Sequence, residues 1–500
     1  MNSVFKNCLI FATIIAVQSA TIAADQPNII LMMGDDHGWD EVAYNGHPHL
    51  KTPVLDEMAA TGLRLDRFYS GHPSCSPTRG SFLTGRHPNR FGTFSPNWSM
   101  RPEEISIGHI MKKAGYRTGH FGKWHVGPVH QNSPTSPGAM GFDEWLSHDN
   151  FFELDPVLVR NGGGPQKYPG ESSEVVIDET ISFIGRAQKS DQPFMAVVWF
   201  GSPHEPYMGL PEDLALYDDL PAEYAEQTVD LTSTETGQPT SRPLRDVLRE
   251  RYAEITAMDR AIGKLRDHLK TAGLRKNTIV LYCGDNGVPL SGDGATNPFR
   301  ELKGSVYDGG IRVPGVVEWP AKIKRPRASG LPTVTSDFLP TLADLVGQPL
   351  PVRPIDGESF VSLLTHDMPA RERPIFFWQY DTSNEVENHP EPYIEPLLQE
   401  GTTPLIKMMA GKYTRTFRNQ KHETINATDF NGPRAVVYDG YKLVIDGDNI
   451  AGTELFSLAD DFTESVNLAT RYPAKTEALK AKLQHWQFSV LHSLTGADYE

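Results

Sequence analysis

The chain has 500 residues, of which 39% are hydrophobic and 22% charged, so its composition excludes disordered, collagen-like and coiled-coil proteins and is typical of a globular one. Its 47 Lys and Arg residues against 63 Asp and Glu residues give a formal net charge of −16. Because nonspecific nucleic-acid binding needs a basic footprint, we expect no nucleic-acid partner. An anionic ligand would have to meet positive charge gathered in a local pocket.

Residues 1–24 have the pattern of a secretory signal peptide. Lys6 precedes the apolar stretch Leu9–Val17, and Thr21–Ala24 offers small residues for cleavage. The stretch is short for a membrane span, and no later stretch is long and apolar enough for one, although an uncleaved anchor is the alternative. We therefore expect a secreted or periplasmic protein with no stable membrane span.

Three short apolar segments predict strands that are buried on both faces. They are Asn28–Met33, Pro193–Phe200 and Thr278–Cys283, and each is followed at once by polar residues. Between the last two, apolar residues from Leu248 to Leu269 recur at the helical period. This alternation predicts an α/β fold with a doubly wound, mostly parallel central sheet flanked by helices, in which ligands bind beyond the carboxyl ends of the strands.

The pattern changes after about residue 350. Ala435–Tyr438 and Tyr441–Ile445 flank an Asp-Gly turn and predict a hairpin, Glu454–Leu458 adds a strand, and an amphipathic helix follows near the C-terminus. We therefore predict a catalytic α/β core at 25–350 and, at 351–500, a smaller antiparallel sheet with a final helix. Two polar segments, 205–243 and 380–432, are interpreted as surface insertions.

Two pairs of oxygen-bearing side chains follow two of the predicted strands. Asp35 and Asp36 follow the first, and Asp285 and Asn286 follow the third. If these strands are neighbours, the four side chains converge, and such hard oxygen ligands suit Ca²⁺ or Mg²⁺ better than Zn²⁺. Either pair taken alone is more simply a turn or helix cap.

A lone cysteine, Cys75, stands in a polar stretch with Pro77 and Arg79. Pro77 suits the first turn of a helix, so Cys75 would lie at a helix N-terminus, where an anion is favoured. The arrangement Cys-x-Pro-x-Arg resembles the signature of the type I formylglycine-dependent sulfatases, the arylsulfatase family of the alkaline-phosphatase-like superfamily. An ordinary buried or redox cysteine is the alternative for this residue alone.

Further segments resemble the same family in the same order. The later matches are Gly115–Thr118 with Gly122–Gly127, Ser202–Pro206, Lys303–Pro314, Ser336–Thr341, and Glu454–Leu458 with Asn467-Leu468. One departure is Asp308, where many members of the family carry Glu. The resemblance covers roughly residues 26 to 470.

The resemblance implies a mechanism and a set of site residues. A separate maturation enzyme would oxidise Cys75 to formylglycine, whose hydrate would attack the sulfur of a sulfate ester beside one Ca²⁺, with Mg²⁺ the less expected ion. His204 would protonate the leaving alcohol and His125 would hold the formylglycine hydroxyl. The implied catalytic set is Cys75, Arg79, Lys123, His125, His204 and Lys303, and the implied metal ligands are Asp35, Asp36, Cys75, Asp285 and Asn286.

The expected substrate is a sulfated carbohydrate, attacked at a terminal residue. Aromatic residues in the insertions would suit sugar rings: Trp145, Phe151, Phe152, Tyr207, Trp378 and Tyr380. Three alternatives stay open. They are a phosphodiesterase or phosphonate monoester hydrolase on the same scaffold, a non-catalytic glycan-binding homologue with unconverted Cys75, and a zinc hydrolase, which the lack of a His-rich ligand set disfavours.

Overall fold

The computed structural model describes residues 26–499 apart from 234, 235, 237, 290–296, 384, 410–411 and 448–451. The expected signal peptide, residues 1–24, lies outside the described residues. Among the described residues, ten strands form one large sheet that runs through the middle of the molecule. Their order across the sheet is β14 (Arg327–Ser329), β2 (Leu63–Leu65), β13 (Gly315–Glu318), β11 (Thr278–Gly284), β1 (Asn28–Gly34), β8 (Phe194–Trp199), β4 (Arg117–Lys123), β5 (Glu144–His148), β6 (Val157–Arg160) and β7 (Pro165–Lys167).

The centre of this sheet is parallel. β11, β1, β8, β4 and β5 run in one direction, whereas β13, β2, β6 and β7 pair with antiparallel neighbours. The three apolar segments of the sequence are the strands β1, β8 and β11, and they lie side by side. The predicted mostly parallel α/β sheet is therefore confirmed.

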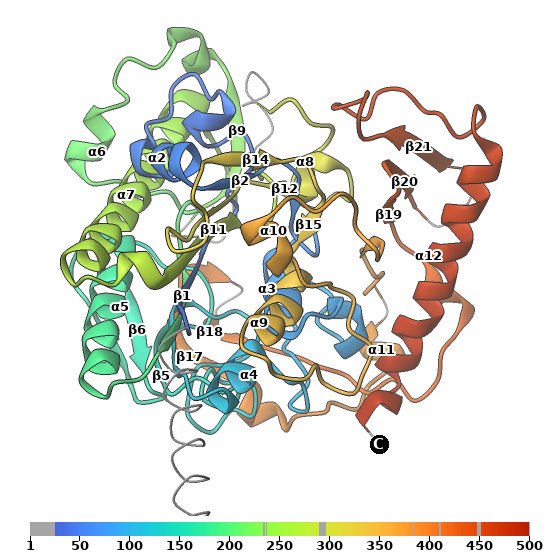
Figure 1. Ribbon diagram of the computed structural model, residues 1–500, viewed down its shortest axis with the longest axis horizontal. Helices are drawn as coiled ribbons and strands as arrows, with labels where there is room; N and C mark the ends of the chain where they lie inside the picture. Colours follow the sequence, from blue (N-terminus) through green and yellow to red (C-terminus); the bar gives the residue numbers. More distant parts are fainter. Residues whose placement is uncertain are drawn as a thin grey trace, which may run out of the picture.

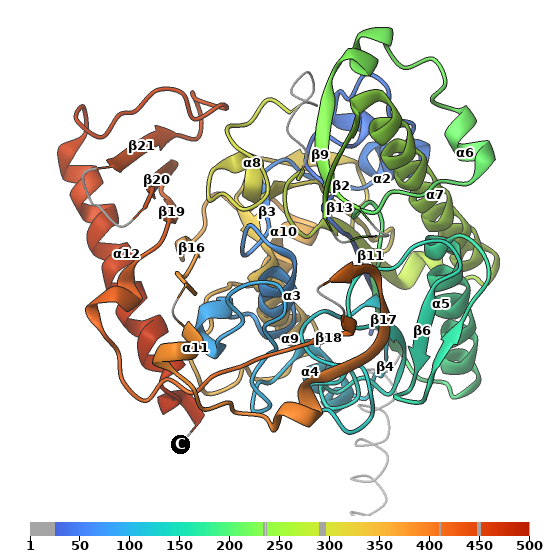
Figure 2. The same ribbon diagram turned by 180° about the vertical axis from the view of Figure 1, so that it is seen from behind.

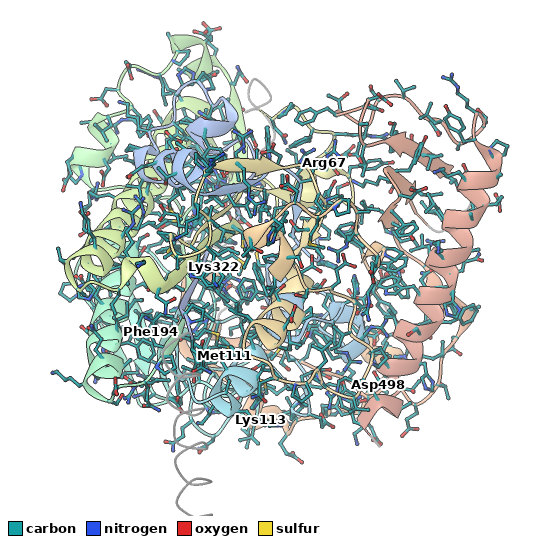
Figure 3. All side chains as sticks on the ribbon, viewed as in Figure 1. Arg67, Met111, Lys113, Phe194, Lys322 and Asp498 are labelled. Atoms are coloured by element: carbon teal, nitrogen blue, oxygen red, sulfur yellow. The ribbon has the colours of Figure 1, made fainter. Side chains whose placement is uncertain are left out.

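Helices cover both faces of the sheet because neighbouring residues of a strand point to opposite faces. Ile29, Leu31 and Met33 of β1 pack in a hydrophobic cluster with α3 (Cys75–Thr84), α4 (Ile107–Lys113), α9 (Phe338–Leu345) and α10 (Val361–Thr365). Ile30 and Met32 face a second cluster with α2 (Pro53–Thr61), α5 (Ser172–Lys189) and α7 (Leu244–Thr271). The two helix layers lie on either side of β1 in Figures 1 and 2, and Figure 3 labels one member of each cluster, Met111 and Phe194.

Segment 205–243, which was predicted to be a surface insertion, is partly buried. It forms α6 (Pro211–Ala215) and the antiparallel pair β9 (Thr228–Thr232) and β10 (Pro239–Pro243). Tyr217, Leu220 and Tyr224 are buried in a cluster of their own against α7. Short strands complete the core beside α8 (Asp308–Ile311), namely β3 (Phe68–Tyr69), β12 (Arg312–Val313) and β15 (Thr333–Val334).

The last part of the chain forms a separate layer. A four-stranded sheet has the order β16 (Ile375–Trp378), β19 (Arg434–Tyr438), β20 (Tyr441–Ile445) and β21 (Thr453–Ser457), and the long helix α12 (Pro473–Leu494) lies along it (Figure 1). Leu443, Leu479 and Trp486 belong to one buried cluster between this sheet and α12. The predicted antiparallel sheet with a covering helix is thus present, with the hairpin turn at Asp439-Gly440.

Two further elements come from segment 380–432. They are the short helix α11 (Glu385–Asn388) and the long hairpin β17 (Glu400–Met409) and β18 (Lys412–Thr416). Figure 2 shows this hairpin on the face of the core beside β6. The hairpin is held there by Asp149, whose Oδ2 accepts hydrogen bonds from the backbone and hydroxyl of Thr403.

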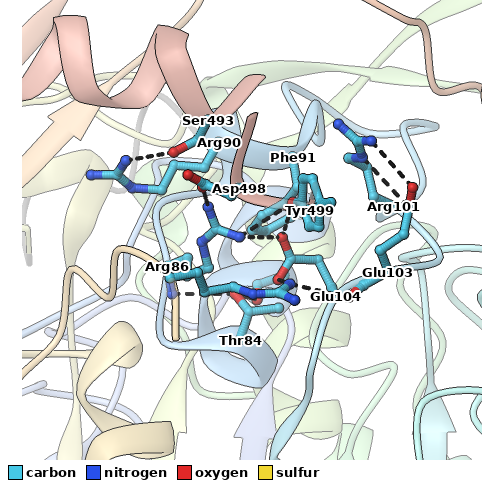
Figure 4. Close-up of polar contacts among 12 residues, drawn as sticks. Thr84, Arg86, Arg90, Phe91, Arg101, Glu103, Glu104, Ser493, Asp498 and Tyr499 are labelled. Atoms are coloured by element: carbon cyan, nitrogen blue, oxygen red, sulfur yellow. Dashed lines mark hydrogen bonds and ion pairs between the residues drawn. The ribbon is translucent and has the colours of Figure 1, made fainter. Parts of the chain in front are cut away.

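Buried ion pairs fasten the C-terminus to the core. Arg86 donates to Glu104 at 2.7 Å and contacts Asp498, and the Tyr499 hydroxyl donates to the same Glu104 carboxylate (Figure 4). We call Arg86, Glu104, Asp498 and Tyr499 the C-terminal anchor. Within the described part of the chain, no helix is both long and apolar enough to cross a membrane.

Candidate active site

The ends of β1 and β11 bring four oxygen-bearing side chains together. Gly34 and Gly284 are paired in register, so the residues that follow them emerge side by side. The Asp36 amide donates to Asp285 Oδ1 at 2.8 Å, and Asn286 Nδ2 donates to Asp36 Oδ1 at 2.8 Å. Asp35, at the same edge, is fully buried. The structure therefore places four of the five predicted metal ligands together at the carboxyl ends of β1 and β11.

Cys75 is the first residue of α3 and is buried. Its Sγ lies 3.6 Å from Asp36 Oδ1 and 3.5 Å from Lys303 Nζ. Burial raises the pKa of the Cys75 thiol well above its ordinary value, so the thiol is held neutral. An uncharged thiol is a poor nucleophile.

Three cations surround these acidic groups. Lys123, at the end of β4, contacts Asp35, and Lys303 Nζ donates to Asp36 Oδ1 at 2.5 Å. Arg79 lies one helical turn after Cys75, where it donates to Asp285 Oδ2 at 2.8 Å and to the Lys123 carbonyl at 3.1 Å. Arg79 thus ties α3 to the ends of β11 and β4.

Two histidines approach the same group from other strands. His204, after β8, has its Nε2 3.7 Å from Asp36 Oδ2, while its Nδ1 is hydrogen-bonded to the Glu205 carbonyl at 2.6 Å. His125, after β4, is buried, and neither of its ring nitrogens has a hydrogen-bond partner among the described residues. His125 and Asp36 both adopt a positive φ, of 58° and 60°. Such strained backbone at non-glycine residues concentrates at functional sites.

The charges of this site perturb one another strongly. Burial, opposed by Lys123 and helped by Asp285, raises the pKa of Asp35. Burial also disfavours the Asp36 carboxylate, but the cations, Lys303 first, outweigh it and hold the pKa of Asp36 well below its usual range. Burial lowers the pKa of His204 to about 3 and that of His125 well below its ordinary value. Both imidazoles are therefore neutral in the ligand-free protein.

The donor set fits a hard divalent cation. Asp35 Oδ1 and Asn286 Oδ1 are buried and lack a hydrogen-bond partner in the described part of the chain. Three carboxylates lie close together at the carboxyl ends of the strands. Ligand atoms of Asp35, Asp36, Cys75 and His204 all lie within 4.8 Å of one another. Buried oxygens without donors are costly unless a cation or water meets them, and oxygen ligands suit Ca²⁺ or Mg²⁺.

Two further residues lie beside the site, and one of them, Arg415, carried no signal in the sequence. Phe151 stacks on His204, with ring centroids 4.4 Å apart and planes at 15°. Arg415, on β18, is buried near Cys75, and burial lowers the pKa of its guanidinium to about 10 against the influence of Asp149 and Cys75. Arg415 lies far along the chain from every motif, and only the fold of the β17–β18 hairpin brings it here.

The six aromatic residues expected to line a sugar site are all buried in the protein. Trp378 and Tyr380 pack in the cluster beneath α12, and Phe152 belongs to the core beside α5. These three therefore stabilise the fold and are not an exposed sugar platform. Phe151 alone among the six stacks on a residue of the predicted catalytic set.

Comparisons with known proteins agree on one family. The family model described as Sulfatase matches residues 27–348. The chain is 31% identical over 353 residues to the ulvan-active sulfatase of Formosa agariphila, covering 70% of this chain and 67% of that protein. It is 30% identical over 392 residues to human arylsulfatase A, covering 73% of each protein.

Solved structures support the fold. The crystal structure of Ps i-CgsB superposes with a TM-score of 0.71 at 21% identity, covering 93% of both chains. The PsFucS1 sulfatase from Pseudoalteromonas sp. superposes with a TM-score of 0.65 at 20% identity, covering 95% of both chains. With a family match over more than half of its length, this chain belongs to the sulfatase family, sulfuric ester hydrolases of the alkaline-phosphatase-like fold.

Proposed function

We propose that this protein is an exported sulfatase that removes sulfate from carbohydrates, using formylglycine at position 75 and one bound Ca²⁺. The observation that carries the proposal is the buried convergence of Asp35, Asp36, Cys75 and His204, whose ligand atoms lie within 4.8 Å. Lys123, Lys303 and Arg79 lie around this group. A sulfate ester is a compact anion, and such a pocket supplies the local positive charge that the acidic surface does not.

The state of Cys75 supports its conversion. The thiol atom stands where the oxygens of formylglycine would lie, 3.6 Å from Asp36 and 3.5 Å from Lys303. As a thiol, residue 75 is neutral because burial raises its pKa. Oxidation by a maturation enzyme would supply an aldehyde whose hydrate is an oxygen nucleophile for sulfur, the chemistry that the family resemblance implies.

Asp35, Asp36, Asp285, Asn286 and residue 75 would hold the Ca²⁺. Two buried oxygens without a hydrogen-bond partner among the described residues favour an ion here: Asn286 Oδ1, and Asp35 Oδ1, which lies 3.5 Å from Arg79. When bound, a divalent cation polarises a sulfate oxygen and orients the group for attack. Mg²⁺ is the second choice, because it demands a tighter octahedral site and keeps its waters.

The remaining residues of the site have different roles, which follow from where each one lies. Lys123 and Lys303 offer ammonium groups to the sulfate oxygens, and Arg79 holds Asp285 and the β4 terminus in place. His204 is the general acid: its Nδ1 is tied to the Glu205 carbonyl, which leaves Nε2 facing the pocket. A bound anion raises the pKa of this imidazole from its low ligand-free value and supplies the protonated form. His125, with both ring nitrogens unpartnered, holds the hydroxyl of residue 75.

The substrate proposal rests on the relatives. One is named an ulvan-active sulfatase, another, from mouse, an N-acetylgalactosamine-6-sulfatase at 30% identity, and a third, from Bacteroides thetaiotaomicron, an endo-4-O-sulfatase at 29% identity. From these names we infer a sulfated carbohydrate substrate. Removal of sulfate at a terminal residue is the prediction made from the sequence, and the endo-4-O-sulfatase relative does not support it. Arg415 on the β17–β18 hairpin is the additional cation that would meet such a substrate.

A second candidate function is hydrolysis of phosphodiesters or phosphonate monoesters. A phosphonate monoester hydrolase of Agrobacterium radiobacter shares the fold, with a TM-score of 0.60 at 19% identity. A phosphodiester or phosphonate monoester carries one negative charge, as a sulfate ester does, so the charge of the pocket does not separate the two classes. We favour sulfate esters because the family match and the named relatives are sulfatases. The same cations argue against a non-catalytic glycan-binding role.

The chain organisation is part of the proposal. Residues 1–24 would be the signal peptide of a secreted or periplasmic protein, 25–350 the catalytic core and 351–500 a C-terminal subdomain. Support for the division comes from the four-stranded sheet and α12, which pack in one hydrophobic cluster together with Phe94 and Trp98 of the core.

The deciding experiment measures sulfate released from a panel of sulfated oligosaccharides, with matched phosphodiesters as the comparison. We expect sulfate release from one chain end, at a rate per end that is nearly independent of oligosaccharide length. Random internal desulfation would overturn terminal attack, and preference for the phosphodiesters over every sulfated sugar would overturn the sulfatase assignment of the pocket.

A further inference from the structure

A second cluster of ligand-type side chains lies far in sequence from the candidate active site. Glu385 opens the short helix α11, and the His389 amide donates to the Glu385 carbonyl at 2.9 Å, so the two residues stand one helical turn apart. His422 follows the β17–β18 hairpin and returns to the same place. The spacing of Glu385 and His389, i and i+4, puts both side chains on one face of the turn.

The three side chains meet in a buried place. Glu385 is 3% exposed, His389 6% and His422 1%, and one ligand atom of each lies within 4.8 Å of the other two. The two imidazole rings have centroids 4.1 Å apart, and His422 Nε2 contacts Glu385 Oε1. Apart from that contact, Glu385 Oε1 and both Nε2 atoms have no hydrogen-bond partner among the described residues. One buried histidine nitrogen without a partner, His389 Nε2, thus lies beside the contacting pair of His422 and Glu385.

The other ring nitrogen of His422 fixes which of its atoms faces inward. His422 Nδ1 is hydrogen-bonded to the Gln420 carbonyl at 3.1 Å. A carbonyl accepts only from a protonated nitrogen, so in a neutral His422 ring Nε2 carries the lone pair. His389 Nε2 is buried and has no hydrogen-bond partner among the described residues. Metal-ligating histidines are oriented in this way by backbone carbonyls.

We propose that Glu385, His389 and His422 bind one divalent transition-metal ion of the Zn²⁺ class. Two imidazole nitrogens and one carboxylate oxygen are a zinc ligand set, unlike the all-oxygen group beside Cys75. A water completes the tetrahedron, because His422 also borders a surface hollow of about 350 Å³ with Tyr393 and Lys421. Without an ion, His389 Nε2 would stay buried without a hydrogen-bond partner, which is costly.

The ion would close the base of a long loop. Residues 385 and 422 flank the β17–β18 hairpin that carries Arg415 toward Cys75. His422 also packs edge-on against Phe94 of the core, with ring centroids 5.6 Å apart. Joining the two ends of this segment removes conformational freedom from the hairpin. The proposed zinc is therefore structural, and it sets the position of a pocket residue.

The first test uses the full-length protein as purified, dialysed against buffer containing Zn²⁺ and then against metal-free buffer. Elemental analysis should find one zinc per chain, and X-ray absorption should show imidazole ligands with metal–ligand distances of about 2.0–2.1 Å. In protein stripped with a chelator, added Zn²⁺ alone should raise the melting temperature as its free concentration rises. Absence of zinc and no response to added Zn²⁺ would overturn the proposal.

Variants assign the ion to these residues. Loss of an outer-shell partner of a metal ligand lowers metal affinity by about 10- to 100-fold. His389→Ala and His422→Ala each remove a ligand itself, so each should lower the zinc affinity by more than this. His485→Ala, on an exposed face of α12, is the matched control and should keep wild-type zinc. If either variant fails to fold, the stoichiometry and absorption spectrum of the wild type still decide. Zinc retained in full by both variants, or bound through sulfur, would refute the site.

Discussion

The candidate active site and the C-terminal anchor are both buried clusters of opposite charges, but they are completed differently. In the anchor, both carboxylate oxygens of Glu104 have partners: Oε1 meets Arg86 and Tyr499, and Oε2 lies 3.5 Å from Arg353. In the active site, the buried Asn286 Oδ1 has no hydrogen-bond partner among the described residues, and Asp35 Oδ1 is met by Arg79 Nη2 at 3.5 Å without a hydrogen bond.

This difference separates a structural cluster from a functional one. Paired buried charges hold two parts of the chain together, because breaking them leaves an uncompensated charge. Buried oxygens without a hydrogen-bond partner, and strained backbone at Asp36 and His125, lower the stability of the folded protein. Such features concentrate at sites that bind a ligand. Changes in the active site should therefore abolish turnover while the fold persists, whereas changes in the anchor should do the reverse.

The largest effect is expected from Cys75→Ala. Removing the nucleophile position should lower kcat by about 10⁴- to 10⁶-fold, as in other enzymes that lose a nucleophile, while the melting temperature changes little. Mass spectrometry of the wild-type peptide should show loss of sulfur and gain of an aldehyde oxygen at residue 75. Full activity with an unmodified thiol would contradict the proposed role.

The second-largest loss of activity is expected from His204→Ala, and its size should depend on the substrate. Loss of a general acid costs about 10²- to 10⁴-fold for substrates whose leaving group needs a proton. Nitrophenyl sulfate has a good leaving group and should lose far less. The measurement is kcat/KM for a sulfated sugar and for nitrophenyl sulfate with the same enzyme preparation. Equal losses on both would assign the acid role to another residue.

Arg86→Met addresses the anchor. It leaves Asp498 without the Arg86 cation and Glu104 with Arg353 at 3.5 Å in its place. The free energy of unfolding should therefore fall by about 3–5 kcal/mol, measured by denaturant titration. Activity per folded molecule should stay near wild type. Lys112→Met, which removes the exposed ion pair with Asp143, is the control and should cost no more than about 1 kcal/mol. If Arg86→Met lost turnover without losing stability, the anchor would not be the purely structural cluster proposed here.

Acid should act on the histidine-containing regions and spare the anchor, which has no imidazole. Burial lowers the pKa of eight buried histidines: His37, His47, His72, His87, His120, His125, His148 and His204. For His37 and His72 the values are about 4 and about 3. Below pH 6.5 the unfolded chain binds protons that the folded chain does not, so their stabilising effect is complete above pH 6.5 and is lost as the pH falls.

The loss of stability in acid depends on how many more protons the unfolded chain binds than the folded chain. Each such histidine contributes up to about 1.4 kcal/mol per pH unit between its two pKa values. Buried carboxyls with raised pKa, such as Asp259 at about 7, act in the opposite sense but are fewer. The free energy of unfolding measured at pH 7, 6 and 5 should therefore decline. A constant or rising value would show that the carboxyls dominate.

Much of the catalytic core was predictable from local patterns. The apolar segments that became β1, β8 and β11 are continuous because both of their faces are buried, and residues directly after them form the site. β4 was missed because its sequence, Arg117–Lys123, alternates glycine with polar residues although it is buried. It packs under helices whose positions no local pattern reveals.

The sequence by itself determined the family, the sheet class and the identity of the groups that chemistry needs, because those depend on motifs whose residues are close together in the chain. Tertiary structure decided which of these groups touch. Register between β1 and β11 joins Asp36 to Asp285, and the β17–β18 hairpin brings Arg415 to Cys75. It also decided that Glu385, His389 and His422 meet, since contacts across a hairpin depend on packing between distant elements and not on local propensity.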